Sequence, residues 1–438
     1  DRFGSACMQG PRIVNWYRGV AKGFGGNPDY IDKPDISEDC LYLNIWAPRD
    51  NINKDKIPVL LYIHGGANRA GWSFEPNYIG KNLASKGVIV ITVSYRLGVF
   101  GFYSHPELEI SNFALLDLIE SLKWIKDHIH KVGGDPNNIT ISGESAGATN
   151  VAHLIASPLS KDLFQRAIHQ SAGWSIAEKN LDSKIPNNLS NNLSIELFGN
   201  DNSETKLKQL RNVDSIKLLN KAEEIYGYQG YYPVIDNYTI FEPLYKSFEL
   251  GNFNHVDLII GTNADEELMY LDKDYYLSDF YDERQSWGFY SDIKNLELIL
   301  ENINGEKQKI NFILTARNWT CPSLFMAKSI NKYSNKNVDL AKNYFGTFVT
   351  EDIDATAALI SDDVEWQGCF YGSPVMNKEE AVEYSKGWHA AMENISYTAE
   401  NYLPGVDPET GLLNGSVRTY GTWTGTNTAS GKDFEVLM

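Results

Sequence analysis

Ser145 lies at the centre of the pentapeptide Gly143-Glu144-Ser145-Ala146-Gly147, which follows the apolar run Ile139-Thr140-Ile141. A serine on a tight strand-to-helix turn presents its hydroxyl outside the sheet, and glycines two residues to either side permit close backbone packing. The next residues, 146–156, are small, apolar and compatible with a helix. This order predicts a nucleophile elbow for acyl transfer, although an ordinary Gly-Ser turn can carry the same letters.

A glycine-rich loop supplies the second half of such a site. The strand-like run 58–63 ends in His64-Gly65-Gly66-Ala67, whose small residues leave backbone N–H groups free to approach a ligand. We predict that the amides of Gly66, Ala67 and Ala146 form an oxyanion hole, where each donor can contribute about 3 kcal/mol. A plain strand-to-loop turn is the alternative interpretation.

Four blocks of sequence resemble the type B carboxylesterases, the cholinesterase-like family. They are residues 37–46, 94–102 and 133–139 and the elbow itself, in the family's order, and the resemblance extends over roughly the first 330 residues. The resemblance implies an α/β-hydrolase fold, in which helices flank a mostly parallel sheet. Strand-like runs that alternate with helical stretches independently favour this α/β class: 58–63, 88–95, 139–142 and 256–261 with 112–131 and 146–156.

The resemblance also identifies a candidate acidic residue. Residues 256–266 resemble the strand and loop that end in the family's triad glutamate, so Glu266 is the candidate and Asp265 the neighbouring alternative. A buried carboxylate there orients a histidine and stabilises its imidazolium form. Glu267 stands where the family usually has glycine, a difference that can alter the loop, and a solvated acidic loop is the alternative.

The histidine that should act as general base has no clear position. In this fold the chain order is serine, acid, histidine, and only His389 follows Glu266. Residues 383–392 around His389 form a helical pattern unlike the family's histidine loop, so His389 is a possible base without motif support. We expect the other seven histidines to be packed or surface residues: His64, His105, His128, His130, His153, His169 and His255.

The sequence changes character beyond residue 338. Patterns indicate helices at 338–350, 352–360 and 378–395 and strands at 364–368 and 417–425. This order resembles the nuclear transport factor 2-like superfamily in its small SnoaL-like form, which implies an α+β cone around an apolar pocket and, in many members, dimerisation. We therefore expect a type B carboxylesterase-like domain at 1–333 and a nuclear transport factor 2-like domain at 338–438. Five residues could line its pocket, although ordinary packing is the commoner role: Asp363, Trp366, His389, Tyr420 and Trp423.

Both ends of the chain resemble interrupted family segments. Residues 1–7 resemble an internal part of the family sequence, and the family's first strands and its histidine region have no counterpart. Residues 434–438 read as part of a strand. An excerpt, a fragment or a gene fusion would each give this pattern.

Composition limits the remaining possibilities. The chain has 438 residues, of which 42% are hydrophobic, which gives room for two globular domains. Its net charge of −18 disfavours nucleic acid and anionic membranes as partners. The longest apolar run, 87–103, contains Arg96, so no membrane span is expected. Because no His or Cys cluster has ligand spacing and no phosphate-binding loop occurs, we expect neither a metal nor a cofactor.

The four cysteines carry a hint about location. Cys7 and Cys40 occupy positions that resemble a family disulfide, which suggests an extracellular or periplasmic protein. Cys321 and Cys369 fall in different expected domains, and we expect both to be free thiols.

The resemblance implies a carboxylic ester hydrolase that acts on small-molecule esters through a serine acyl-enzyme. Tyr30 occupies the place where members that cleave choline esters carry tryptophan, which favours a generalist short-chain esterase. Because the base has no motif, the alternative is a catalytically impaired scaffold whose C-terminal cone binds a small molecule.

Overall fold

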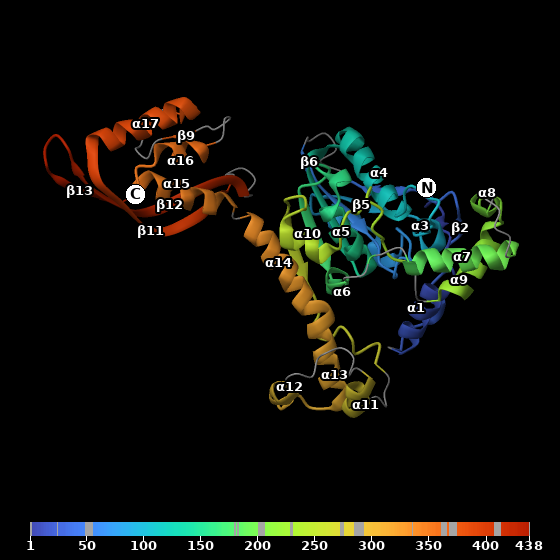
Figure 1. Ribbon diagram of the computed structural model, residues 1–438. Coiled ribbons are helices and arrows are strands. Elements are labelled where there is room, and N and C mark those ends of the chain that lie inside the picture. Colours follow the sequence, from blue (N-terminus) through green and yellow to red (C-terminus); the bar gives the residue numbers. More distant parts are fainter. Residues whose placement is uncertain are drawn as a thin grey trace. The chain divides into compact units, whose positions relative to one another are not determined.

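The chain folds into two compact units, Asp1–Ile330 and Asn331–Met438, in the computed structural model (Figure 1). The structure describes residues 2–23, 25–48, 56–178, 181, 184–199, 206–227, 231–271, 276–283, 293–334, 336–360, 366–367, 375–406 and 413–437. Each unit has its own sheet, so each is described by itself.

A six-stranded, mostly parallel sheet forms the centre of the first unit. The strand order is β3-β5-β4-β6-β7-β8, with β3 antiparallel to β5 and the remaining neighbours parallel. The strands are β3 (Leu43–Trp46), β4 (Ile57–Ile63), β5 (Ile89–Val93), β6 (Gly134–Glu144), β7 (Arg166–Gln170) and β8 (Asp257–Gly261). The α/β class with a mostly parallel sheet, predicted from alternating strand and helix signals, is confirmed.

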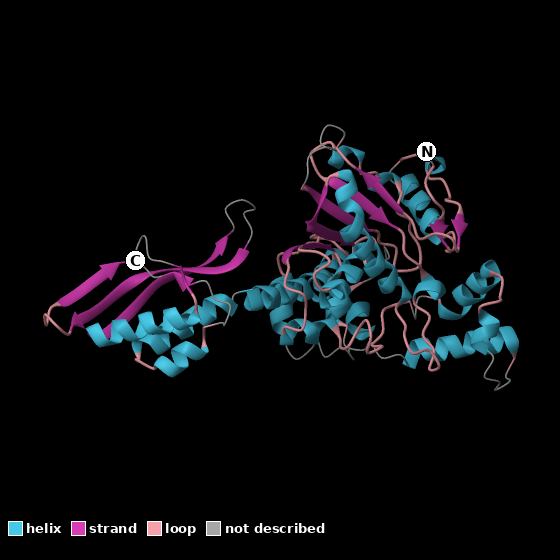
Figure 2. Cartoon of the chain, turned by 90° about the horizontal axis from the view of Figure 1, so that it is seen from above, coloured by secondary structure: helices cyan, strands magenta, loops and turns pink. Residues whose placement is uncertain are grey.

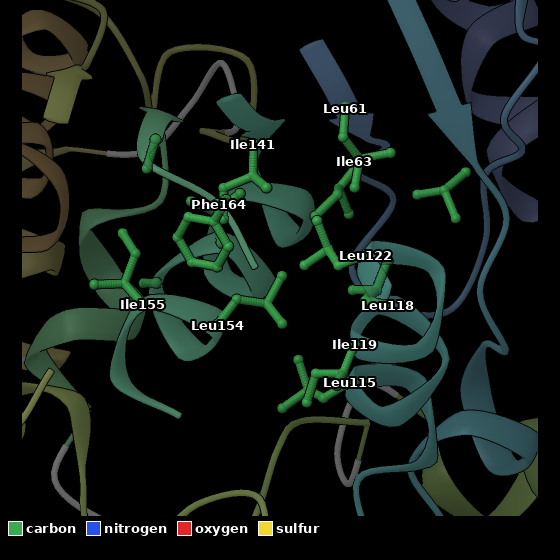
Figure 3. Packing of buried hydrophobic residues seen from close by; sticks show 14 of the residues in the cluster. Leu61, Ile63, Leu115, Leu118, Ile119, Leu122, Ile141, Leu154, Ile155 and Phe164 are labelled. Atoms are coloured by element: carbon green, nitrogen blue, oxygen red, sulfur yellow. The ribbon is translucent and has the colours of Figure 1, made fainter. Parts of the chain in front are cut away.

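Burial explains why the central strands have these sequences. All five residues of β5, Ile-Val-Ile-Thr-Val, are buried, as expected of a parallel strand that is covered on both faces. Two helices carry much of the cover, α4 (Phe113–His128) and α5 (Ala146–Ala156). Figure 3 shows Leu118 and Leu122 of α4 directed toward Leu61 and Ile63 of β4 in the main core cluster.

The first unit contains further helices. They are α1 (Arg12–Gly23), α2 (Lys81–Ala84), α3 (Gly98–Gly101), α6 (Gly173–Ala177), α7 (Lys184–Phe198), α8 (Lys206–Leu210), α9 (Ser215–Tyr226), α10 (Leu244–Leu250), α11 (Leu277–Glu283), α12 (Ile293–Leu300) and α13 (Glu306–Thr315). Of these helices, α10 contacts α5 and α11 contacts α13. Helix α14 (Cys321–Ser334) ends just beyond the division between the units. Among the described residues, no helix has both the length and the apolar composition needed to span a bilayer.

A small two-stranded sheet lies close to a disulfide near the N-terminus. Strands β1 (Ala6–Cys7) and β2 (Ile36–Ser37) pair in parallel, and Cys7 is bonded to Cys40 with a Cα–Cα distance of 4.9 Å. Both half-cystines are buried in the main core. Cys321 is a free, exposed thiol, and Cys369 lies outside the described residues.

The second unit places helices against an antiparallel sheet. Helices α15 (Lys336–Val349), α16 (Ile353–Ala358) and α17 (Lys378–Ala391) accompany the three-stranded sheet of β11 (Met392–Val406), β12 (Leu413–Asn427) and β13 (Asp433–Leu437). A short pair, β9 (Trp366–Gln367) and β10 (Val375–Met376), completes its described elements. Figure 2 shows these helices on one face of the sheet, where Phe348, Ile395 and Trp423 form a buried cluster.

One predicted helix in this unit is too long. The pattern indicated a helix over 378–395, but α17 ends at Ala391 and the chain enters β11 at Met392. Asn394 has a φ of 56° at a register shift between Glu393 and Ser396, and Ile395 is buried beyond it. Pairing with β12 and burial of a β-branched side chain therefore override the helical periodicity.

Candidate active site

Ser145 sits on a sharp turn between β6 and α5, as the elbow prediction requires. Its φ of 54° and ψ of −125° are unusual for a residue other than glycine. The Ser145 N–H donates to Gln170 O at 3.0 Å, and its carbonyl accepts from the Thr149 N–H at 2.9 Å. Bonds on both sides thus fix a strained backbone, and the half-buried side chain lies at a cavity wall.

The two glycines of the pentapeptide have no room for a side chain. A Cβ added to Gly147 would lie 2.1 Å from the Ile63 carbonyl oxygen, and one on Gly143 would lie 2.4 Å from the Gly147 carbonyl carbon. Helix α5 therefore begins directly against the end of β4. This close approach is the physical reason for the glycine spacing around Ser145.

The glycine-rich loop passes directly against the nucleophile. A Cβ on Gly65 would come within 3.2 Å of Ser145 Cβ. Gly66, Ala67 and Asn68 follow with φ values of 106°, 58° and 57°, a consecutive run in the left-handed region. Such a backbone is sustained only by its surroundings.

The amides predicted to form the oxyanion hole are available. In the described part of the chain, no acceptor is recorded for the N–H groups of Gly66 and Ala67. The Ala146 N–H opens α5 and has no acceptor within its helix. The positive end of the α5 dipole adds to the attraction for a developing oxyanion.

Four polar contacts that the sequence did not predict hold the loop in place. Asn150 Nδ2 of α5 donates to Asn68 Oδ1 at 3.0 Å, and the Gly98 N–H donates to Asn68 O at 2.7 Å. The Gln9 amide makes a reciprocal pair with Gly71, with 2.8 Å to both its N–H and its carbonyl. Asn68, Asn150 and Gln9 are all buried, so the loop is anchored to α5, to α3 and to the N-terminal segment.

The fourth contact is an ion pair at the edge of the cavity. Arg69 Nη2 donates to Glu223 Oε2 of α9, and the guanidinium carbon lies 5.2 Å from the centre of the Tyr231 ring. The Arg69 side chain is almost fully buried. This pair ties the residue after Asn68 to a helix far away in sequence.

Glu266 is held differently from its two acidic neighbours. Its Oε1 accepts from the Asn263 N–H at 2.7 Å, and the residue is buried. Asp265 Oδ1 instead accepts from Asn311 Nδ2 at 2.8 Å, and Glu267 Oε1 accepts from Trp319 Nε1 at 2.9 Å. The three carboxylates therefore have distinct partners, and Glu266 is the one whose charge acts on Glu144.

Glu144 has an unusually high pKa for a glutamate. Burial, with smaller effects of the Glu266 and Glu75 carboxylates, raises the pKa of Glu144 to about 7. The residue as a whole is exposed, and its carboxyl group lies beside the oxyanion loop, with Oε2 2.9 Å from the position that a Cβ on Gly65 would take. Near neutral pH, Glu144 is thus present in both protonation states.

A cavity of about 230 Å³ opens at Ser145. The oxyanion loop and Glu144 form one part of its wall. Four aromatic side chains also line it: Trp16, Tyr17, Tyr78 and Tyr270. Two acidic residues, Glu144 and Glu223, and two basic ones, Arg12 and Arg69, leave its lining without a strong excess of either charge.

No histidine is among the residues that line this cavity in the described part of the chain. His64 lies beneath the oxyanion loop, where its ring stacks on Tyr95 at 4.5 Å and burial lowers its pKa to about 4. His389 belongs to the second unit, and its Nε2 is 2.8 Å from the Phe348 carbonyl oxygen. The roles of Ser145, Glu266 and His389 in a triad stay predictions.

The described residues contain no candidate metal site. Within the described ranges, no group of three or more His, Cys, Asp or Glu side chains is arranged to hold a metal ion. What the arrangement around Ser145 offers is a hydroxyl, three backbone donors and two nearby carboxyl groups.

Known proteins resemble the chain most clearly in its first unit. The profile of the carboxylesterase family matches residues 1–348. Fumonisin B1 esterase of Sphingopyxis macrogoltabida is 35% identical over 270 residues, which are 57% of this chain and 48% of that protein. Para-nitrobenzyl esterase of Bacillus subtilis (strain 168) is 37% identical over 283 residues, 62% of this chain and 54% of that protein.

Solved structures give the same picture. A PNB esterase has a TM-score of 0.62 at 29% identity and covers 76% of this chain and 66% of its own. A thermophilic PNB esterase has a TM-score of 0.60, also at 29% identity. The chain spans about half the length of the curated relatives it matches.

Proposed function

The chain belongs to the carboxylesterase family, and from that premise we propose that it hydrolyses small carboxylic esters through an acyl-enzyme on Ser145. The strained turn at Ser145 is the observation that carries this proposal. The glycine-rich loop passes against Ser145, and no acceptor is found among the described residues for the N–H groups of Gly66 and Ala67. The similar fumonisin B1 and para-nitrobenzyl esterases support ester hydrolysis as the reaction.

Each group in the site has a part in this reaction. Ser145 Oγ attacks the ester carbonyl carbon, and the new oxyanion accepts hydrogen bonds from Gly66, Ala67 and Ala146. A base takes the serine proton and returns it to the departing alcohol, after which water cleaves the acyl-enzyme. In this proposal Glu266 orients that base, for which His389 is the candidate that the chain order leaves.

Aromatic walls and mixed charges favour uncharged ester substrates. Trp16 and Tyr270 are well exposed at the cavity, so an apolar acyl or alcohol group gains contact area there. The balanced lining gives no reason for selection of a cationic or an anionic substrate. The Cys7–Cys40 disulfide supports an extracellular or periplasmic location.

Short-chain p-nitrophenyl esters test the proposal. We expect p-nitrophenyl acetate and butyrate to be cleaved by the full chain at rates well above those of its Ser145→Ala variant. Equal rates for the two proteins would refute ester hydrolysis at Ser145. A fluorophosphonate probe that fails to label Ser145 would favour the alternative, a scaffold that binds esters without cleaving them.

The second unit supports a further candidate role. Its helices lie on one face of a curved sheet around the rings of Phe348, Tyr397 and Trp423, an arrangement consistent with a nuclear transport factor 2-like cone. We infer that such a cone would bind a small molecule or mediate dimerisation. Removal of residues 331–438 should then abolish ligand binding or shift the chain to a monomer in light scattering; no change would refute this role.

A further inference from the structure

A second cavity, of about 430 Å³, lies at the far end of α5. None of its lining residues lines the Ser145 cavity. His153, which contributes to its wall, follows Ser145 by eight residues, or about 12 Å along a helix. Nothing in the proposed hydrolysis of esters uses this second cavity.

Hydrogen bonds fix the walls of the second cavity. The Asn254 N–H donates to Ile155 O at 2.8 Å, and Asn254 Nδ2 donates to Ser157 O at 3.0 Å, so this loop is attached to the end of α5. On the other side, Asp236 Oδ1 accepts from the N–H groups of Thr239 and Ile240 at 2.8 and 3.0 Å. The cavity is therefore preformed, as small-molecule sites usually are.

One part of the lining is apolar and aromatic. Phe241 is 55% exposed although it belongs to the cavity wall, and Phe253, Ile240 and Ala156 lie in the same lining. An apolar group that covers exposed aromatic surface in a concave, preformed site makes the free energy of binding more favourable. This part fits a ring or a short alkyl chain.

A buried imidazole without a partner provides a polar contact. His153 is 2% exposed, and its Nδ1 has no hydrogen-bond partner. Burial lowers the pKa of His153 to about 3, so the ring is neutral at pH 7 and has one N–H to donate. Nδ1 is enclosed by protein, so the ring nitrogen that can meet a ligand is Nε2, which makes no hydrogen bond among the described residues.

The cavity lining contains one acidic residue, Glu242, and one basic residue, Lys161. Glu242 is already engaged, because its Oε1 accepts from Asn252 Nδ2 at 2.9 Å and its Oε2 lies 3.6 Å from Lys246 Nζ. Lys161 also lines the cavity and makes no ion pair among the described residues. Lys161 is exposed, so its ammonium group is available to an acidic ligand at the cavity.

We propose that this cavity binds an aryl-alkyl carboxylic acid, whose ring contacts Phe241 and Phe253 while its carboxylate is held by Lys161 and His153. The apolar wall accounts for the ring, and the unpaired ammonium and the imidazole account for the carboxylate. The proposal is independent of ester hydrolysis, since a chain without a working nucleophile has the same second cavity.

Calorimetric titration of the Ser145→Ala variant of the 438-residue chain tests whether Lys161 recognises the carboxylate of the ligand. We use 4-phenylbutyrate as the probe and 4-phenylbutan-1-ol as its uncharged analogue. Lys161→Gln in this background should weaken 4-phenylbutyrate about fivefold and leave the alcohol within twofold. Lys86→Gln, which alters an exposed lysine elsewhere, should change neither affinity.

Two further variants locate the binding. Ala156→Trp fills the cavity and should abolish binding of both probes, and Phe241→Ala should weaken both about tenfold. Because Phe241 is well exposed, its loss leaves the fold intact and covers the case in which Ala156→Trp does not fold. Absence of saturable binding, unchanged affinity in Phe241→Ala, or equal loss of acid and alcohol in Lys161→Gln would each overturn the proposal.

Discussion

The loop predicted to form the oxyanion hole and the region predicted to supply the base differ in how many of the expected groups are present near Ser145. On the oxyanion side, the loop beside Gly65 is fixed by Asn150, Gln9 and Glu223 from three separate parts of the chain. On the base side, Glu266 is oriented by Asn263, but no imidazole lines the cavity among the described residues. In the proposed reaction, stabilisation of charge and transfer of a proton would therefore depend on different parts of the chain.

Replacement of the acid gives the largest expected effect and tests whether the base side is complete. Glu266→Gln should lower kcat/KM for p-nitrophenyl butyrate about a thousandfold, because an amide no longer stabilises an imidazolium. Asp265→Asn is the matched control, since its carboxylate is bonded to Asn311, and it should cost less than tenfold. A small loss in Glu266→Gln would show that Glu266 orients no base.

Loss of the Gly147 contact should break the oxyanion side. In Gly147→Ala the new Cβ would lie 2.1 Å from the Ile63 carbonyl oxygen, so α5 or β4 must shift. We expect the free energy of unfolding to fall by about 3 kcal/mol and fluorophosphonate labelling to slow strongly. Gly19→Ala, where a Cβ meets nothing within 4 Å, should do neither; equal behaviour of the two variants contradicts the prediction.

Removal of a single anchor should have a smaller effect on the same side. Asn68→Ala deletes the acceptor for Asn150 Nδ2 and should reduce kcat about tenfold with little change in KM, because donor placement matters most in the transition state. Asn82→Ala, at an exposed position, serves as the control for the substitution itself. A change confined to KM would count against a positioning role for Asn68.

The pH dependence of stability should show the smallest effect. Because the pKa of Glu144 is raised to about 7 in the fold, the native state holds a proton that the unfolded chain releases near the ordinary glutamate pKa. This contribution is complete at low pH and is lost as pH rises through about 7. Glu144→Gln should therefore flatten the decline in urea-measured stability between pH 5 and pH 8, whereas Glu38→Gln should not.

The sequence predicted the parts of this site whose signals are local. The run 139–141, the glycine spacing and the small residues after Ser145 suffice for the elbow, and four of the six strands, β4, β5, β6 and β8, coincide with predicted strand-like runs. The anchors could not be predicted, because Gln9 and Gly71 are 62 residues apart and Arg69 and Glu223 are 154 apart.

In the second unit as well, a distant contact changes what the local sequence pattern predicts. The helical periodicity after residue 378 is real, yet the helix ends before Met392, because Met392, Glu393 and Ser396 pair with β12 and Ile395 is buried. Local pattern identified the element, and a distant strand decided where it stops.

The hydrogen bonds between Gln9 and Gly71 connect the oxyanion loop to the disulfide near the N-terminus. Gln9 lies two residues beyond Cys7, whose bond to Cys40 closes a loop of 33 residues. The segment whose Gln9 bonds to Gly71 is therefore held by this disulfide as well as by packing in the core. The acyl transfer proposed for Ser145 should therefore depend on whether Cys7 and Cys40 are oxidised.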